Sequence, residues 1–165
     1  MITAVILTLN EENILSKCLR SLDFVDEILV FDSFSTDKTV DIAKSFKARV
    51  VQRKFDNYSN QRNAALSSVH LDSNWILMID ADEIIEKDLK NEIIRVTDLK
   101  NNISLYSVRR MDMFRGKWLK YSSGYPTWFP RLFKNGKVQV NREINEEYIC
   151  EGKTAYLNEH LIHYP

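Results

Sequence analysis

A short apolar segment that ends in acidic residues restricts the fold of this chain more than any other feature. Residues 75–79 read Trp-Ile-Leu-Met-Ile, and Asp80-Ala81-Asp82-Glu83 follows without a break. A segment this short and this apolar is typical of a strand that is buried on both faces, as in a parallel sheet. Open sheets of that kind bind ligands at the carboxyl ends of their strands. The sequence therefore predicts an α/β fold with a polar site at Asp80 and Asp82.

The two aspartates allow two interpretations. Side chains at positions i and i+2 of an extended segment point the same way, so Asp80 and Asp82 could reach one cation. Mg²⁺ and Mn²⁺ prefer carboxylate and phosphate oxygens, which favours a metal–diphosphate site. The alternative is that Asp82 and Glu83 open the next helix, because acids are favoured in a first helical turn. Taken alone, the motif leaves both interpretations open.

Strand-like and helical segments alternate along the first part of the chain. Apolar runs mark expected strands at residues 3–9, 27–31, 49–51 and 75–79. Apolar residues at helical spacing mark expected helices within residues 14–22, 40–46, 58–69 and 89–96. This alternation predicts a mostly parallel central sheet flanked by helices.

The pattern changes after about residue 103. Strand-like pieces then dominate, at residues 104–114, 128–134, 137–140, 154–157 and 161–164. They predict a less regular, mixed second half. The chain has 165 residues, enough for one compact domain and too few for two ordinary ones. We therefore expect one domain over residues 1–165, divided into halves at 1–102 and 103–165.

The distribution of glycine excludes two common phosphate-binding motifs. The four glycines are Gly116, Gly124, Gly136 and Gly152, so the first 115 residues contain none. A Walker loop and a dinucleotide fingerprint both need glycines at a turn from strand to helix. A phosphate site in the first half must therefore depend on a metal ion and arginine.

Cysteine and hydropathy give an expectation of location. Cys18 and Cys150 do not suggest a disulfide framework, and Cys18 falls on the apolar face of an expected helix. The first residues do not resemble a signal peptide, and no apolar stretch approaches membrane-spanning length. These features predict a cytoplasmic protein with reduced thiols.

Four motifs, taken in order, resemble a known family. They are Thr-Leu-Asn-Glu-Glu (8–12), Glu-Ile-Leu-Val-Phe-Asp-Ser-Phe-Ser-Thr-Asp (27–37), Gln-Arg-Asn-Ala-Ala (61–65) and Asp-Ala-Asp-Glu (80–83). Together they look like the signature of family-2 inverting glycosyltransferases. Pro-Arg-Leu-Phe-Lys (130–134) resembles bacterial members that extend lipopolysaccharide core oligosaccharides. The resemblance implies a GT-A (nucleotide-diphospho-sugar transferase) fold, a UDP-sugar donor, a divalent metal (Mg or Mn), and transfer of a hexose to a glycan or glycolipid acceptor.

The resemblance also implies roles for individual residues on the donor side. It assigns the nucleotide-sugar pocket to Thr8, Asn10, Glu11, Asp32, Arg62, Asp80 and Ala81. Asp82 would ligate the metal and act in catalysis, with Asp80 beside it. The simpler alternatives are that Asn10 caps a helix and that Arg62 is a solvated charge on a helix.

The catalytic base and a third metal ligand are assigned in the second half. Inversion needs a base opposite the leaving group, and alignment with the family favours Glu146 over the neighbouring Glu143 and Glu147. The family often has histidine where this chain has Asn145, so three solvated loop acids remain the alternative. His163 would be a third metal ligand from the last strand, the alternative being a structural histidine.

A basic and aromatic segment indicates the acceptor side. Residues 109–142 hold nine Lys or Arg against one acid, Asp112, among many aromatic residues. Such a segment suits a phosphorylated glycolipid or an anionic membrane surface, and the alternative is core packing with solvated charges. No RNA-binding motif accompanies it, so we expect no nucleic-acid partner.

A different class of function also stays open. Family members usually continue beyond a segment like His-Tyr-Pro (163–165), so this chain could be truncated relative to them. A homo-oligomer or a partner subunit could supply missing acceptor contacts. The alternative to an enzyme is a non-catalytic nucleotide- or glycan-binding module.

Overall fold

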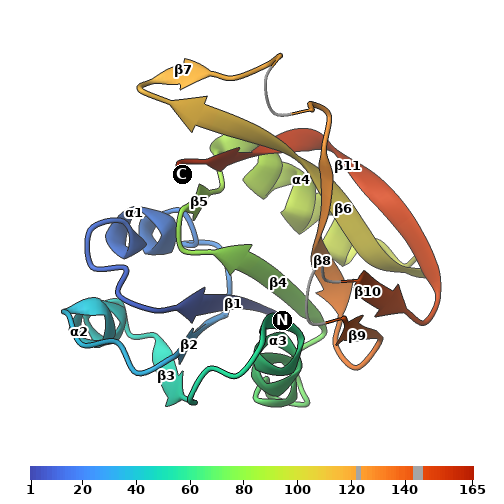
Figure 1. Ribbon diagram of the computed structural model, residues 1–165. Coiled ribbons are helices and arrows are strands. Elements are labelled where there is room, and N and C mark those ends of the chain that lie inside the picture. The colour runs from blue at the N-terminus through green and yellow to red at the C-terminus, as the bar shows by residue number, and fades with distance from the viewer. Residues whose placement is uncertain (122–123, 143–146) are drawn as a thin grey trace.

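The computed structural model describes residues 1–121, 124–142 and 147–165 (Figure 1). The helices are α1 (Leu15–Arg20), α2 (Thr39–Ser45), α3 (Tyr58–Ser67) and α4 (Lys87–Asp98). The strands are β1 (Ile2–Thr8), β2 (Glu27–Asp32), β3 (Arg49–Gln52), β4 (Trp75–Asp80), β5 (Glu83–Ile84), β6 (Ile103–Phe114), β7 (Lys117–Trp118), β8 (Trp128–Lys134), β9 (Val138–Asn141), β10 (Glu147–Cys150) and β11 (Lys153–His163).

The first half is a parallel sheet, as its alternating pattern predicts. The strand order is β3-β2-β1-β4, and every neighbouring pair is parallel. In β1, Thr8 pairs with Asp32 of β2, and Leu7 pairs with Asp80 of β4. The carboxyl ends of these three strands therefore lie side by side at one edge of the sheet.

The same sheet continues into a mixed second half. In the described residues the order extends through β4-β8-β6-β11-β5, and the short strand β7 pairs with β6 alone. Strand β8 is antiparallel to its two neighbours, β4 and β6, whereas β6 and β11 are parallel to each other. The predicted α/β fold, with a mostly parallel sheet and a mixed second half, is confirmed.

Both faces of the central strands are covered, which explains why β1 and β4 are almost wholly apolar. Apolar residues of α1, α2 and α4 pack with Ala4, Ile6 and Leu77 on one face. Helix α3 covers the other face with Ala65, while residues of β9 and β10 pack at its border. Strands buried on both faces cannot alternate polar and apolar residues, so their runs are continuous.

One alternative and one expectation from the sequence are wrong. Asp82 and Glu83 do not open a helix, since Glu83 begins the two-residue strand β5 and α4 starts only at Lys87. The segments 154–157 and 161–164 are not separate strands, since residues 154–163 belong to the single strand β11, which has an irregularity between Tyr156 and His160.

Both cysteines are free thiols, and no helix in the described ranges is long and apolar enough to cross a membrane.

A buried carboxylate holds the irregular part of β11 against helix α4. Glu92 is only 7% exposed, and its two oxygens accept the backbone N–H of Asn158 at 2.9 Å and that of Glu159 at 2.9 Å. The side-chain amide of Asn158 donates to Glu92 Oε1 at 2.8 Å. A bulge exposes amides that the sheet cannot satisfy, and Glu92 accepts them. This contact fixes the course of β11 toward its last residue, His163.

We expect Glu92→Ala to lower the free energy of unfolding by about 2 kcal/mol, because it removes the acceptor of three hydrogen bonds to a charged group. Urea denaturation followed by circular dichroism measures the change. The control is Glu86→Ala, an exposed carboxylate that precedes the same helix and makes no capping bond. Equal stability of the two variants would contradict this role of Glu92.

Candidate active site

A cavity of about 370 Å³ opens at the carboxyl ends of β1 and β4, beside the first turn of α3. Its lining contains six of the side chains that the resemblance assigns to the donor or the metal: Thr8, Glu11, Arg62, Asp80, Ala81 and Asp82. These residues come from three elements of the first half of the chain. Parallel strand ends bring them together, as expected for an α/β sheet.

Asp32 lies beneath the cavity rather than in its wall. It is fully buried and accepts hydrogen bonds from Thr8 Oγ1 at 2.9 Å, Gln52 Nε2 at 2.9 Å and the Ser35 backbone N–H at 2.9 Å. Burial alone would raise the pKa of Asp32, but these bonds together with one from the Ser35 hydroxyl lower it. Asp32 therefore positions Thr8 and the loop after β2.

Asn10 joins the loops that follow β1 and β2. Its side-chain oxygen accepts the Thr36 backbone N–H at 2.8 Å, and its own backbone N–H donates to Ser35 Oγ at 2.9 Å. Asn10 has a left-handed φ of 59°, which asparagine tolerates better than most residues. It does not cap a helix, since the caps of α1 and α2 are Ile14 and Lys38, so the capping alternative is wrong.

Two arginines hold Asp80 at the mouth of the cavity. Arg131 Nη2 lies 2.7 Å from Asp80 Oδ2, and Arg62 Nη2 lies 3.2 Å from Oδ1. Burial opposes ionisation of Asp80, but the charges of Arg131 and Arg62 lower its pKa to about 2. Arg62 is 8% exposed, so the interpretation of this residue as a solvated helix charge is wrong.

Arg131 also binds a second buried acid. Its Nη2 atom lies 2.7 Å from Glu83 Oε1, and Glu83 Oε2 accepts the Asp80 backbone N–H at 3.0 Å. Arg131 is 5% exposed and Glu83 is fully buried. The pair fixes both the side chain and the backbone of Asp80. Sequence reasoning missed this role, although both residues stand in quoted motifs.

Asp82 lies beside a histidine from the end of β11. His163 Nε2 is 3.0 Å from Asp82 Oδ2, and His163 Nδ1 is 2.7 Å from Asp112 Oδ1. The hydrogen bond to Asp82, the largest influence, raises the pKa of His163, and Asp112 adds to it. The structure thus brings together Asp82 and His163, both predicted as metal ligands, and adds Asp112 behind the imidazole.

The donor set around Asp82 suits a divalent ion. Asp82 Oδ1 is buried and has no hydrogen-bond partner in the described residues. Within the same residues, no group of three or more His, Cys, Asp and Glu side chains is gathered closely enough to hold an ion. The residues that could contact an ion here are Asp82 and His163, and Mg²⁺ or Mn²⁺ would need water and substrate phosphate oxygens as further ligands.

The local potential also favours a cation. Burial raises the pKa of Glu11, and the negative charges of Asp82, Asp37 and Asp80 raise it further. Asp80 contacts Arg62 and Arg131, whereas Asp82 faces His163. The predicted catalytic base, Glu146, lies outside the described residues.

Six residues of the cavity wall were not assigned to it from the sequence: Leu7, Leu9, Ser33, Phe55, Tyr58 and Gln61. The rings of Phe55 and Tyr58 meet edge to face at 5.1 Å between centroids. Gln61 donates to Ser33 Oγ at 3.0 Å. Gln61 precedes Arg62 in a quoted motif, which is the only signal that could have indicated it.

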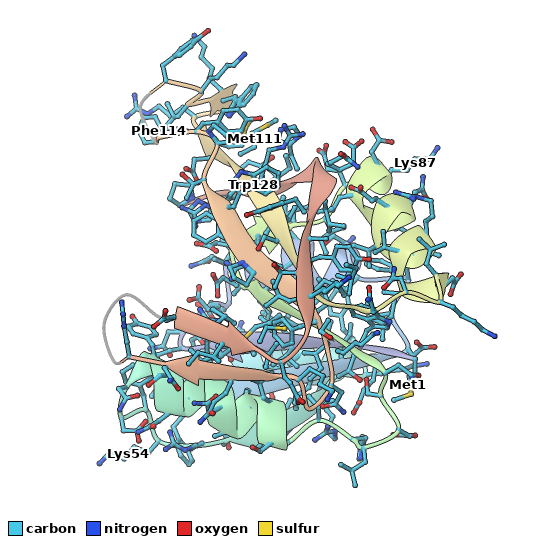
Figure 2. All side chains as sticks on the ribbon, turned by 90° about the vertical axis from the view of Figure 1, so that its right-hand side faces the viewer. Met1, Lys54, Lys87, Met111, Phe114 and Trp128 are labelled. Atoms are coloured by element: carbon cyan, nitrogen blue, oxygen red, sulfur yellow. The ribbon has the colours of Figure 1, made fainter. Side chains whose placement is uncertain are left out.

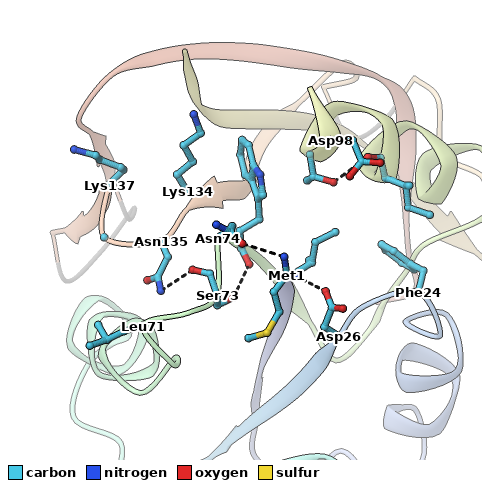
Figure 3. Close-up of a pocket in the computed structure, with 15 residues that line it drawn as sticks. Met1, Phe24, Asp26, Leu71, Ser73, Asn74, Asp98, Lys134, Asn135 and Lys137 are labelled. Atoms are coloured by element: carbon cyan, nitrogen blue, oxygen red, sulfur yellow. Dashed lines mark hydrogen bonds between the residues drawn. The ribbon is translucent and has the colours of Figure 1, made fainter. Parts of the chain in front are cut away.

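A larger cavity, of about 820 Å³, lies at the opposite edge of the sheet (Figure 3). Its polar groups bind one another: Asp26 Oδ2 accepts the Ile2 backbone N–H at 2.6 Å, and Asn135 Nδ2 donates to the Ser73 carbonyl at 3.1 Å. It lies near the amino ends of β1 and β4, whereas parallel sheets bind ligands at the carboxyl ends. Size alone therefore does not identify the functional cavity.

The model of the family "Glycosyl transferase family 2" matches residues 3–163. The chain belongs to this family. It is 37% identical over 176 residues to an uncharacterized glycosyltransferase of Rickettsia felis, covering 99% of this chain and 62% of that protein. It is 28% identical over 161 residues to the lipopolysaccharide core biosynthesis glycosyltransferase LpsC of Rhizobium meliloti, covering 93% of this chain and 59% of that one. The chain spans only 34% to 40% of the length of four of the first curated relatives that it matches, and 62% of the length of the Rickettsia felis protein.

Solved structures share the fold. The S. aureus TarS 1–349 structure in complex with UDP-GlcNAc superposes with a TM-score of 0.70 at 16% identity, covering 99% of this chain and 58% of that one. Glucosyl-3-phosphoglycerate synthase from Mycobacterium tuberculosis, in complex with Mn²⁺, UDP and glucosyl-3-phosphoglycerate, gives 0.55 at 24% identity, covering 68% and 44%. The fold of this family-2 chain is GT-A, as the resemblance implied.

We expect Arg131→Met to lower the free energy of unfolding by about 3–5 kcal/mol, because it leaves the fully buried Glu83 carboxylate without its cation and removes one of the two arginines that contact Asp80. Arg131→Met combined with Glu83→Gln should recover part of that loss. Urea denaturation measures both variants. Arg20→Met, on the exposed end of α1, is the matched control, and a loss no larger than in this control would contradict the assignment.

We expect Asp32→Asn to reduce the acid sensitivity of the protein. Because the folded pKa of Asp32 is lowered, its contribution to stability is present above the unfolded value of about 3.9 and is lost as pH falls through the folded value. The wild type should therefore lose more unfolding free energy between pH 6 and pH 3 than the variant does. Asp72→Asn, a substitution of the same type at an exposed position, is the matched control.

Proposed function

We propose that this chain forms the catalytic region of a metal-dependent, inverting glycosyltransferase that moves a hexose from a UDP-sugar to a glycan or glycolipid acceptor. The observation that carries the proposal is that Arg62, Asp80 and Asp82 line one cavity at the carboxyl ends of β1 and β4, and that His163 contacts Asp82. Family membership supports the transfer reaction. The complexes of TarS with UDP-GlcNAc and of the mycobacterial synthase with UDP support the choice of donor.

The donor would lie along the edge formed by β1, β4 and α3. Thr8 and Glu11 offer oxygen acceptors, and Asp32 holds Thr8 in place from below. Arg62 offers a guanidinium group whose planar N–H donors match phosphate oxygens. Because the first half has no glycine loop, this arginine and a cation are the available partners for a diphosphate.

Asp82 and His163 would hold the divalent ion. Asp82 Oδ1 is buried and unpartnered in the described residues, and Asp112 orients the imidazole from its Nδ1 side. A carboxylate behind a metal-ligating histidine is the usual arrangement at such sites. Asp80 remains a predicted ligand, but both of its oxygens contact arginines, so direct ligation would require it to give up one of them.

When bound, the ion offsets the negative charge that develops on the departing diphosphate. Arg62 would add a second positive charge to the same oxygens. The buried pair of Arg131 and Glu83 would keep Asp80 from rotating into the donor. Glu146 stays the predicted base for the acceptor hydroxyl. The acceptor, a position at the inner membrane surface and any partner subunit also remain predictions from the sequence.

We expect Asp82→Ala to remove the effect of Mn²⁺ on UDP binding. Isothermal titration of the wild type should show UDP binding that strengthens roughly 10- to 100-fold with Mn²⁺, the range found when metal-site residues are perturbed. The variant should bind UDP equally with and without the ion. Asp41→Ala, an exposed substitution on α2, should behave as the wild type.

Metal dependence that survives in Asp82→Ala would contradict the assignment of the ligand. If the affinity of the wild type for UDP were the same with and without Mn²⁺, the metal-dependent mechanism would be contradicted. Tight binding of a UDP-sugar, with slow hydrolysis and no transfer to any acceptor, would favour the non-catalytic module instead.

A further inference from the structure

The end of β6 and strand β7 form a hairpin that projects beyond the rest of the sheet (Figure 1). Met113 pairs with Trp118 and Phe114 with Lys117 across it. The turn uses Arg115 and Gly116, both with positive φ, of 48° and 77°. We call residues 113–121 the arm. In Figure 2, Phe114 lies in the upper part of the view, on the side away from Lys87 of α4.

The arm is basic and carries exposed aromatic side chains. Arg115, Lys117 and Lys120 are all exposed, and the sequence contains no acid from residue 113 to residue 142. Phe114 is 53% exposed and Tyr121 is 94% exposed. More than half of Phe114 and nearly all of Tyr121 are exposed on this projection, so a partner would bury apolar surface there. The three exposed cations favour an anionic partner by charge complementarity.

The cations of the arm cover the faces of its own rings. The Arg115 guanidinium lies 5.4 Å from the centroid of the Phe114 ring, and Lys120 Nζ lies 5.2 Å from that of Trp118 and 5.9 Å from that of Tyr121. Single-stranded nucleic acid binds by stacking bases on open aromatic faces. Rings paired with cations instead suit a lipid headgroup layer, where amphipathic side chains place their apolar parts inward and their charges at phosphates.

The arm also lies next to the candidate active site along the chain and in space. It begins at the residue after Asp112, whose carboxylate is 2.7 Å from His163 Nδ1, and His163 Nε2 is 3.0 Å from Asp82. The backbone N–H of Leu119 in the arm donates to the Asp112 carbonyl at 2.9 Å. A surface that held the arm would therefore lie close to the cavity mouth.

We propose that the arm docks this protein on the surface of an anionic phospholipid bilayer, with Phe114 and Tyr121 inserted at headgroup level and Arg115, Lys117 and Lys120 bound to lipid phosphates. Basic residues near such a surface contribute additively through electrostatic attraction, and interfacial aromatic side chains add apolar burial. Docking by the arm needs neither the donor, the metal nor turnover. A failed vesicle experiment would therefore leave the proposed reaction untouched, and the reverse also holds.

The experiment is co-sedimentation of the protein with vesicles of phosphatidylcholine alone and of phosphatidylcholine with phosphatidylglycerol in a 7:3 ratio. We expect binding to the anionic vesicles that weakens as salt is raised. Replacing Arg115, Lys117 and Lys120 by serine should lower the partition coefficient on the order of 100-fold. Phe114→Ser with Tyr121→Ser should lower it while leaving its salt dependence in place. Thermal unfolding shows whether each variant is folded.

The matched control replaces Lys44, Lys87 and Lys100 by serine, which removes the same charge from exposed positions elsewhere. Loss of binding in the arm variants and not in this control supports the proposal. Equal loss in the control, equal binding to neutral vesicles, or no binding by the wild type would overturn it. Loss of binding to a labelled oligouridine in the arm variants, with vesicle binding unchanged, would overturn it and assign the arm to nucleic acid.

Discussion

The ion cluster around Arg131 is the interaction on which the rest of the site depends. A buried guanidinium is tolerated only where carboxylates compensate the loss of hydration, and Asp80 and Glu83 both lie 2.7 Å from it. Arg131 belongs to β8, whereas Asp80 is the last residue of β4 and Glu83 is the first residue of β5. The cluster therefore fixes β8 next to β4. It also leaves Asp80 Oδ1 directed at Arg62, which sets the position of that guanidinium.

A second long-range connection completes the site from the last strand. His163 reaches Asp82 across 81 positions of sequence because β11 runs parallel to β6 and antiparallel to β5. Glu92 accepts the amides that the irregularity of β11 exposes, so the strand can bend without leaving buried donors unsatisfied. The position of one metal-ligand candidate thus depends on a carboxylate of helix α4 that lines no part of the cavity.

The donor edge of the sheet could be predicted from sequence because parallel strands give a strong local signal. Apolar runs end at Thr8, Asp32 and Asp80. Parallel pairing brings the carboxyl ends of these strands together regardless of the conformation of the loops between them. Arg131 could not be predicted in the same way. Its partners are about fifty residues away, and a lone arginine in a strand looks the same whether it faces solvent or a buried acid. That residues 153–163 form one strand could not be predicted for another reason. The polar residues Asn158 and Glu159 interrupt the apolar pattern of β11.

The contact between His163 and Asp82 places a chemical condition on the site. His163 Nδ1 faces the Asp112 carboxylate and must carry a proton there, while Nε2 faces Asp82 Oδ2 at 3.0 Å. Two lone pairs would repel at that distance, so Nε2 requires either a second proton or a metal ion between the groups. The raised pKa of His163 describes the first state. In the second state Asp112 keeps the same bond and orients the imidazole as a ligand. Binding of a divalent ion would then be coupled to release of a proton, and Asp112, the residue before the arm, would support both states.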